Sequence, residues 1–337
     1  MNKVAFLWGR VLGLLFAALM ASSAIAAQPP DYAAMYVFGD SLSDTGNDFA
    51  VTTAQHLVPA IPPSVTPYAT YWQGRFSNGP VAVEYLWRLM SRNNNAQLTP
   101  FVRNPSLEEK SSVNFAFGGS GSGIENATPT GLSVPGLVGQ VGLYTKDLAG
   151  RKSNPNALYV VWSGANDYLP NPYEPNNPKN PNVVVGNIAT SIRALYATGA
   201  RDFLVPNLPD LGGAPLVKAQ PGAAQFTALS KGHNALLAST LSTLSSSLPG
   251  VKIVRLDVFA LGEALASSGL VNVDVPALAF LSPGTGAERC LFGIPSTCVD
   301  VPLSGFVAPF LYWDILHPTT QVHGVIGTAM YAALLRR

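Results

Sequence analysis

The chain has 337 residues, and its 20 lysines and arginines against 19 aspartates and glutamates give a net charge of +1. This even balance argues against a nucleic-acid-binding protein, which normally carries a basic stripe. Only 12% of the residues are charged and 47% are hydrophobic, which excludes a disordered chain and provides enough apolar side chains for a large core.

The first 26 residues have the features of a secretory signal peptide. Lys3 and Arg10 form a basic start, an apolar run covers 11–20, and an Ala-x-Ala pattern ends at Ala26. The apolar run is shorter than the roughly 20 residues that a membrane-spanning helix needs, which disfavours the alternative of a membrane anchor. We therefore expect cleavage near Ala26, a secreted or periplasmic protein, and a single domain over 27–337.

Strand and helix signals alternate through the rest of the chain. Short apolar runs, each followed by glycine, proline or polar residues, predict five buried strands, at 33–38, 113–117, 157–162, 202–205 and 251–256. Apolar residues at helical spacing predict helices at 81–90, 137–148, 183–196 and 226–248, and Pro318 suits the first turn of a last helix that ends near 335. The stretch 168–182, rich in proline and asparagine, is typical of a surface loop. This order predicts an α/β fold with a mostly parallel sheet covered by helices on both faces.

In such a sheet the chemistry lies beyond the carboxyl ends of the strands, and polar residues follow three of the predicted strands there. Ser41 comes just after the first strand, where it is either an exposed nucleophile or only a helix N-cap. The glycine-rich stretch 118–123 either offers backbone N–H groups to an oxyanion or is a flexible loop, and it lacks the spacing of a dinucleotide-binding fingerprint. Asn166 either donates side-chain N–H bonds to an oxyanion or closes an Asx turn.

Near the end of the sequence, Asp314 lies three residues before His317, so its carboxylate can reach the imidazole and set its tautomer. This is the orienting acid and base of a hydrolytic triad, although His317 taken alone could be a solvated surface histidine. Among the other histidines, we expect His233 to pack against the core and His323 to lie on a helix surface. Together these features supply a nucleophile, oxyanion donors, a base and its orienting residue at one edge of one sheet.

The two cysteines, Cys290 and Cys298, both lie in the part of the chain that would be exported, where disulfides persist. We predict one disulfide that closes a small loop, with two free thiols as the alternative. No histidine or second cysteine pair lies near them in the sequence, so we expect no metal site.

These segments resemble the SGNH/GDSL family of esterases and lipases. The resemblance rests on four blocks in the family's order, with further echoes at 74–79 (GRFSNG) and 205–210 (VPNLPD). The blocks are 38–47 (FGDSLSDTGN), 114–121 (NFAFGGSG), 164–167 (GAND) and 314–319 (DILHPT). The resemblance spans roughly 34–335, nearly the whole of the expected mature chain.

The resemblance implies a three-layer α/β/α sandwich, flavodoxin-like, with a five-stranded and mostly parallel sheet. It also implies that Ser41 is the nucleophile, that His317 is the base, and that Asp314 orients His317.

The oxyanion hole follows from the same resemblance. It would be formed by the backbone N–H of Ser41, the side chain of Asn166 and one glycine of the second block. Gly119 aligns best with that glycine, and Gly118 beside it is the alternative.

The implied function is a secreted serine esterase or lipase that forms an acyl-enzyme and needs no cofactor. An acyltransferase that passes the acyl group to an alcohol, and a catalytically silent binding protein on the same scaffold, are the alternatives. An α/β-hydrolase would need the motif G-x-S-x-G, and no serine in the chain is flanked in that way. Apolar residues in 58–71, 271–280 and 301–313 favour a lipid-like or aromatic ester substrate, although these segments could equally be core. We expect no nucleic-acid partner, and the sequence does not define an oligomeric state.

Overall fold

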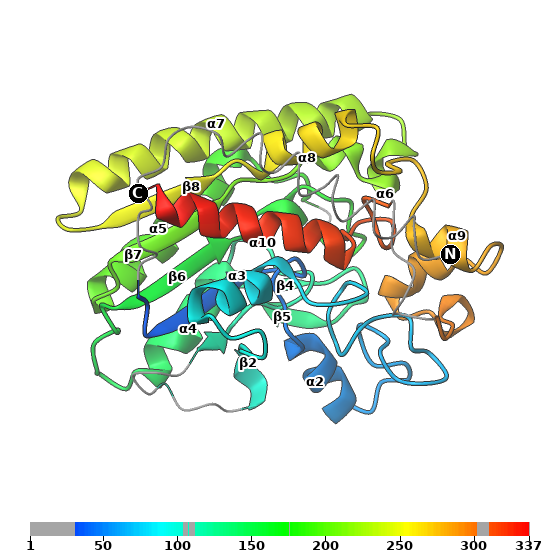
Figure 1. Ribbon diagram of the computed structural model, residues 1–337, viewed down its shortest axis with the longest axis horizontal. Coiled ribbons are helices and arrows are strands. Elements are labelled where there is room, and N and C mark those ends of the chain that lie inside the picture. The colour runs from blue at the N-terminus through cyan, green and yellow to red at the C-terminus, as the bar shows by residue number, and fades with distance from the viewer. Residues whose placement is uncertain (1–30, 104–106, 108–111, 175, 302–309, 337) are drawn as a thin grey trace.

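A computed structural model describes residues 31–336, except 104–106, 108–111, 175 and 302–309. The predicted signal peptide, residues 1–26, lies outside the described residues. Within the described part of the chain, six parallel strands form the central sheet in the order β2-β3-β1-β6-β7-β8 (Figure 1). These strands are β1 (Ala34–Gly39), β2 (Thr99–Pro100), β3 (Val113–Asn114), β6 (Ala157–Trp162), β7 (Asp202–Pro206) and β8 (Lys252–Leu256).

The expectation of five strands is therefore wrong by one. The additional strand, β2, lies at the edge of the sheet, and its two residues are too few to produce a periodic pattern in the sequence. β3 is shorter than expected, but the N–H groups of Phe115 and Phe117 still donate to Val37 and Gly39 of β1, at 2.8 and 3.3 Å. The segment after β3 thus continues beside β1 toward the carboxyl edge of the sheet.

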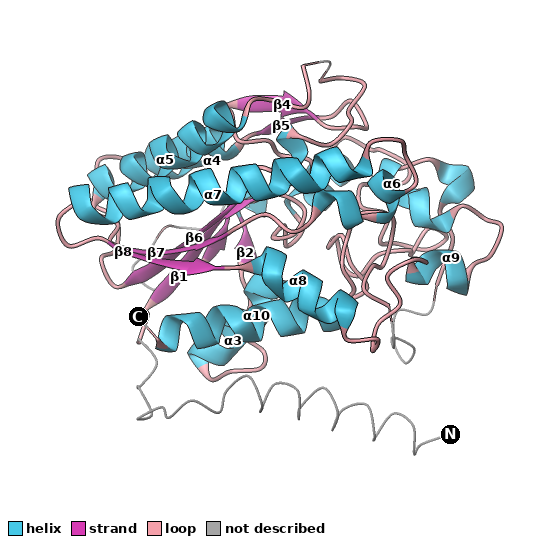
Figure 2. Ribbon diagram, turned by 90° about the horizontal axis from the view of Figure 1, so that it is seen from above, coloured by secondary structure: helices cyan, strands magenta, loops and turns pink. Residues whose placement is uncertain are grey.

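Helices cover both faces of the sheet, which confirms the predicted three-layer α/β/α arrangement (Figure 2). Successive residues of β1 point to opposite faces, so Tyr36 and Phe38 pack on one helical layer and Met35 and Val37 on the other. The first layer consists of α4 (Leu137–Asp147), α5 (Pro181–Thr198) and α7 (Ala223–Ser247), and the second of α3 (Ala82–Ser91), α8 (Val258–Ser267) and α10 (Thr320–Leu335).

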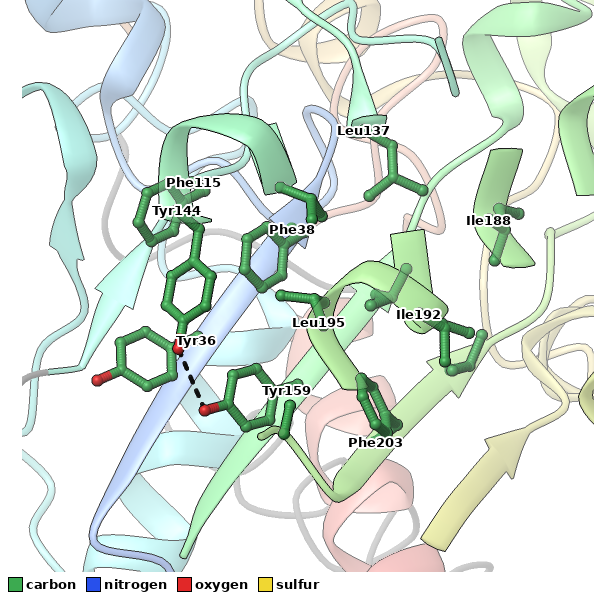
Figure 3. Close-up of a cluster of buried hydrophobic side chains, with 14 of the residues drawn as sticks. Tyr36, Phe38, Phe115, Leu137, Tyr144, Tyr159, Ile188, Ile192, Leu195 and Phe203 are labelled. Atoms are coloured by element: carbon green, nitrogen blue, oxygen red, sulfur yellow. Dashed lines mark hydrogen bonds between the residues drawn. The ribbon is translucent and has the colours of Figure 1, made fainter. Parts of the chain in front are cut away.

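Aromatic rings fill the first of these interfaces (Figure 3). Phe38 of β1 stacks on Phe115 with ring centroids 5.3 Å apart, and Tyr144 of α4 meets Phe38 edge-on at 5.6 Å. The hydroxyls of Tyr144 and Tyr159 lie 3.2 Å apart, so the polar tips of the buried rings are paired. This packing holds β1, and with it the turn that follows, in a defined position.

Shorter elements occupy the connections beyond the strands. α2 (Asn47–Ala54) follows β1, the antiparallel hairpin of β4 (Glu125–Ala127) and β5 (Ser133–Pro135) follows β3, and α6 (Pro215–Lys218) follows β7. α9 (Ala277–Leu281) follows α8. Except for α4, the predicted helices differ from the observed ones by one to three residues at their starts, and the short helices were not predicted.

Of two helix ends predicted from the sequence, the end of α5 is confirmed and the start of α10 is not. Gly199 ends α5 at φ 119, as its position in the sequence predicts. Pro318 does not open the last helix, because it pairs with Tyr312 in an isolated bridge and Thr319 is still extended. α10 begins instead at Thr320, whose N–H donates to Asn78 Oδ1 at 2.9 Å.

The strand register brings the turns after β1 and β6 together. Gly39, the last residue of β1, pairs with Trp162, the last residue of β6. A Cβ atom on Gly39 would lie 2.3 Å from the carbonyl oxygen of Trp162, so the close approach of these two strand ends requires glycine. The residues that follow Gly39 and Trp162 therefore share one edge of the sheet.

The predicted disulfide between Cys290 and Cys298 is present. It joins the short 3-10 helix Ala287–Phe292, which contains Cys290, to the residue that follows a second 3-10 helix, Pro295–Thr297. Among the described residues, no helix is both long enough and apolar enough to cross a membrane.

Candidate active site

Ser41 and His317, 276 residues apart in sequence, meet at the carboxyl edge of the sheet. Nε2 of His317 lies 2.8 Å from Oγ of Ser41, and Nδ1 of His317 lies 2.7 Å from Oδ2 of Asp314. Ser41 is 9% exposed, His317 5% and Asp314 0%. The three predicted residues thus form a continuous chain of hydroxyl, imidazole and carboxylate, in which a proton can pass from the hydroxyl to the imidazole.

Ser41 lies in a tight turn rather than at the start of a helix. The N–H groups of Ser43 and Asp44 both donate to the carbonyl oxygen of Asp40, at 3.0 and 2.9 Å. α2 begins only at Asn47, and Gly46 is its N-cap residue. The interpretation of Ser41 as a helix N-cap is therefore wrong, and its hydroxyl is available to His317.

The GRFSNG segment (74–79) supports the backbone around His317. Ser77 Oγ donates to the carbonyl oxygen of Pro318 at 2.9 Å, and Phe76 lies against the imidazole of His317 with ring centroids 5.1 Å apart. Together with Asn78, which holds the first N–H of α10, these contacts restrict the position of the imidazole.

The oxyanion-hole prediction names three N–H groups, those of Ser41, Gly119 and Asn166. Among the described residues, no hydrogen-bond partner is found for the backbone N–H of Ser41 or of Gly119. Gly118 differs, because its N–H donates to Asp44 Oδ2 at 3.2 Å. The side-chain amide of Asn166 donates one hydrogen to the carbonyl oxygen of Ser120, at 3.0 Å, and its second hydrogen has no partner in the described part of the chain. Of the two glycines, Gly119 is therefore the one whose N–H is without a partner among the described residues, and it stays the predicted donor.

Asn126, which the sequence analysis did not select, is buried and holds this glycine loop by two hydrogen bonds. Its Nδ2 donates to the carbonyl oxygen of Gly119 at 2.7 Å, and its Oδ1 accepts the N–H of Gly121 at 2.8 Å. Its exposed fraction is 8%. The two bonds fix the backbone on both sides of Ser120 and so restrict the loop that carries the Gly119 N–H.

The buried carboxylate of Asp44 also holds the glycine loop in place, by hydrogen bonds to backbone N–H groups. It accepts the N–H groups of Gly46, Asn47 and Asp48 as well as that of Gly118. Burial raises the pKa of Asp44 to about 6 despite these four donors, and burial together with Asp44 raises the pKa of Asp48 well above its usual range. The Ser41 turn, the start of α2 and the glycine loop are joined through this one carboxyl group.

Asp40, directly before Ser41, is also buried. Burial raises its pKa to about 7, while the N–H of Leu42 and the nearby His317 act in the opposite direction. Asp40 can therefore hold its proton close to neutral pH, which limits the negative charge beside the imidazole.

The remaining histidines lie apart from this chain of hydrogen bonds. His233 is buried, as expected, and Nδ1 lies 2.8 Å from the hydroxyl of Tyr168. His323 is 0% exposed, so its predicted place on a helix surface is wrong. It accepts the N–H of Ala82 at 3.2 Å because α10 packs closely against α3, and burial lowers its pKa to about 3. In the described part of the chain, no group of three or more histidine, cysteine, aspartate or glutamate side chains is placed to hold a metal.

A cavity of about 240 Å³ opens beside Ser41 and His317 and extends between α8 and α10. Its walls are predominantly apolar. They include Leu42, Trp162, Leu211, Leu261, Leu265, Leu311, Val322 and Ile326.

This cavity only partly matches the segments that the sequence suggested for an acyl pocket. Val273 and Tyr312 from two of these segments line it, but 58–71 does not contribute to it. α8, which was not predicted, provides one wall. Asn207 Oδ1 holds the start of α8 by accepting the N–H groups of Val258 and Phe259 at 2.7 and 3.1 Å.

Comparison with known proteins gives a family model and several relatives of 27–30% identity. Residues 35–330 match the family model of GDSL-like lipases and acylhydrolases. A GDSL lipase of Tanacetum cinerariifolium is 30% identical over 67% of this chain, and that match covers 64% of the relative, slightly less than two thirds of its length. A GDSL esterase/lipase of Arabidopsis thaliana is 27% identical over 87% of this chain and 88% of the relative. A phosphatidylcholine-sterol acyltransferase of Aeromonas hydrophila is 28% identical over 88% and 89%.

Among solved structures, an acetylxylan esterase of Geobacillus stearothermophilus aligns over 92% of this chain and 96% of its own, with 10% identity and a TM-score of 0.46. This similarity is too low to support an inference about substrate. The match to the family model, by contrast, covers most of the sequence and all four motif blocks. The chain therefore belongs to the GDSL-like lipase/acylhydrolase family and is a carboxylic ester hydrolase by class.

Proposed function

We propose that this chain is an exported serine esterase or lipase that cleaves esters of apolar, lipid-like acyl groups. The observation that carries the proposal is the 2.8 Å contact between Nε2 of His317 and Oγ of Ser41, with Asp314 on the far side of the imidazole. In this role Ser41 is the nucleophile, His317 the general base and Asp314 the group that fixes the tautomer of His317.

The reaction follows from this geometry. His317 accepts the proton of Ser41 while Oγ attacks the ester carbonyl, and the same imidazole then protonates the departing alcohol. The N–H groups of Ser41, Gly119 and Asn166 stabilise the negative oxygen of the tetrahedral intermediate. Water attacks the resulting acyl-enzyme by the same steps and releases the acid.

Support for an apolar acyl group comes from the cavity beside Ser41. An acyl chain bound to Oγ can enter the space between α8 and α10, where it contacts aliphatic and aromatic side chains. The names of two relatives, a lipase and a phosphatidylcholine-sterol acyltransferase, point to the same class of substrate.

Export is the second part of the proposal. The signal-peptide pattern in residues 1–26 and the disulfide between Cys290 and Cys298 both fit an oxidising compartment. We propose that the mature enzyme is a single domain over 27–337.

A fluorophosphonate probe followed by peptide mapping tests the assignment of the nucleophile. We expect the label on the peptide that contains Ser41, and we expect Ser41→Ala to lose both labelling and ester hydrolysis. Ser43→Ala is the matched control, because Ser43 is a buried serine of the same turn whose Oγ has no partner among the described residues. Labelling of another serine, or full activity of Ser41→Ala, would refute the proposal.

Product analysis with and without an alcohol acceptor separates hydrolysis from acyl transfer. We expect free acid as the main product in both cases. A new ester as the main product would replace hydrolase by acyltransferase without changing the assigned residues.

A further inference from the structure

The carboxylate of Asp314 has a hydrogen-bond partner that the sequence did not indicate. Oδ1 accepts the N–H groups of Leu316 and His317, at 2.7 and 2.6 Å, which are local bonds of its own turn. Oδ2 accepts both Nδ1–H of His317 and the hydroxyl of Tyr71, each at 2.7 Å. Tyr71 lies 243 residues away in sequence, so only the tertiary structure brings it to this carboxylate.

The hydroxyl of Tyr71 is buried and protonated, and it donates to Oδ2 of Asp314. Its side chain is fully buried, and burial together with the charge of Asp314 raises the pKa of its hydroxyl well above the usual range. The phenol therefore keeps its proton throughout the pH range in which an esterase works. Tyr71 does not line the cavity beside Ser41, so it is not placed to bind the acyl group.

The backbone at Tyr71 is anchored to the disulfide loop. The neighbouring Thr70 donates from Oγ1 to the carbonyl oxygen of Val299 at 2.8 Å and accepts the N–H of Val299 at 3.2 Å. The indole N–H of Trp313, the residue before Asp314, donates to the carbonyl oxygen of Thr70 at 3.2 Å. Val299 follows Cys298, so these bonds tie the residues before Tyr71 and before Asp314 to each other and to the end of the disulfide loop.

We propose that Tyr71 is a positioning residue for the Ser41–His317–Asp314 chain: its hydroxyl holds Oδ2 of Asp314 against the imidazole and limits the basicity of His317. This inference rests on the proposed function. The reason is that two donors share one oxygen. A bond from the phenol stabilises the negative charge on Oδ2, and the carboxylate then attracts the proton on Nδ1 of the imidazolium less strongly.

Tyr71→Phe removes this donor and keeps the ring. We expect the acid limb of the pH profile of kcat/KM to move upward by about half a pH unit, because the carboxylate then stabilises the imidazolium more strongly. We also expect kcat to fall several-fold and KM to stay unchanged. Asp40 and His323, the other titratable groups that act on His317, are present in both proteins, so the difference between the two profiles reports the phenol.

Two further proteins make the test specific. Tyr144→Phe is the matched control, because Tyr144 is also fully buried and donates its hydroxyl to Ser153 at 2.9 Å in the core away from this site. It should lose comparable stability without moving the pH midpoint. Replacing Tyr71 with 3-fluorotyrosine keeps the fold and strengthens the donor, so the midpoint should move downward; this protein also provides the test if Tyr71→Phe does not fold.

The inference is overturned if Tyr71→Phe folds and its pH midpoint is unchanged. It is also overturned if Tyr71→Phe and the 3-fluorotyrosine protein move the pH midpoint in the same direction. Asp314→Asn separates this failure from failure of the proposed function. Full activity of Asp314→Asn would remove Asp314 from the mechanism altogether. If Asp314→Asn is impaired, we expect Tyr71→Phe to add little to it, because the two residues act through one hydrogen bond.

Discussion

Gly262 offers a direct way to test whether the cavity beside Ser41 binds the acyl chain. It lies inside α8 and lines the cavity, and a Cβ atom at this position would meet no atom within 4 Å. We therefore expect Gly262→Leu to be accommodated and to extend its side chain into the cavity. The variant should be slightly more stable than the wild type, because leucine is favoured over glycine in a helix interior by roughly 1 kcal/mol.

The effect on substrates follows from the volume that the new side chain takes. A leucine side chain occupies the space of about four methylene groups, and each methylene of the acyl chain that stays in water forfeits about 0.8 kcal/mol. We expect kcat/KM for long-chain nitrophenyl esters to fall by about two orders of magnitude, since about 1.4 kcal/mol corresponds to a factor of ten. Acetate and butyrate esters, which do not reach α8, should be hydrolysed as before.

Gly142→Leu is the control for this measurement. Gly142 is an exposed glycine of α4 whose Cβ would also meet no atom, and it does not line the cavity. It should give a similar gain in helix stability and an unchanged chain-length profile. If Gly262→Leu also leaves the profile unchanged, or reduces acetate hydrolysis as much as that of long-chain esters, the cavity is not the acyl site.

Two other predictions concern the buried polar residues. Asn126→Ala should lower kcat about 100-fold with little change in KM, because the Gly119 N–H loses its orientation and one oxyanion donor contributes about 10²–10³ in rate. Asn171→Ala is the control: it removes a 2.8 Å hydrogen bond to the carbonyl oxygen of Ala127 in the same hairpin and should leave kcat unchanged. An equal loss of kcat in both variants would show that Asn126 has no specific role in positioning the glycine loop. Burial lowers the pKa of His233 from 6.5 to about 4. Between pH 6.5 and about 4 the unfolded chain therefore binds more protons than the native state, and the free energy of unfolding falls by roughly 3 kcal/mol as the pH decreases through this range. His233→Gln should lose less stability over this pH range, as measured by denaturant unfolding. If the free energy of unfolding depends on pH equally in the two proteins, His233 is not the group responsible.

The location of the site could be predicted because it depends on a topological rule. Ser41 and Asn166 follow adjacent strands of a parallel sheet, and the carboxyl ends of such strands lie at one edge. His317 is the exception, because it follows no strand of the sheet and was identified from its spacing to Asp314 and from the family motif. Its contact with Ser41 depends on how α10 packs against α3.

The predictions that failed share a physical cause. His323 was expected on a helix surface, but α3 and the sheet both pack against α10. Gly327 permits this approach, since a Cβ there would lie 2.6 Å from the carbonyl oxygen of Ala82. The cavity wall formed by α8 was missed because the start of that helix depends on a distant side chain, Asn207, as well as on its own cap, Asp257.

The local pattern of side chains determined the alternation of strands and helices, the parallel sheet, and the edge at which Ser41 and Asn166 both lie. Periodicity and glycine turns are properties of neighbouring residues, so they can be read without coordinates. Only the tertiary structure decided that Tyr71 donates to Asp314 and that the N–H of Gly119 is without a partner among the residues described. Those features arise where irregular loops from distant parts of the chain pack together, and such packing leaves no periodic signal in the sequence.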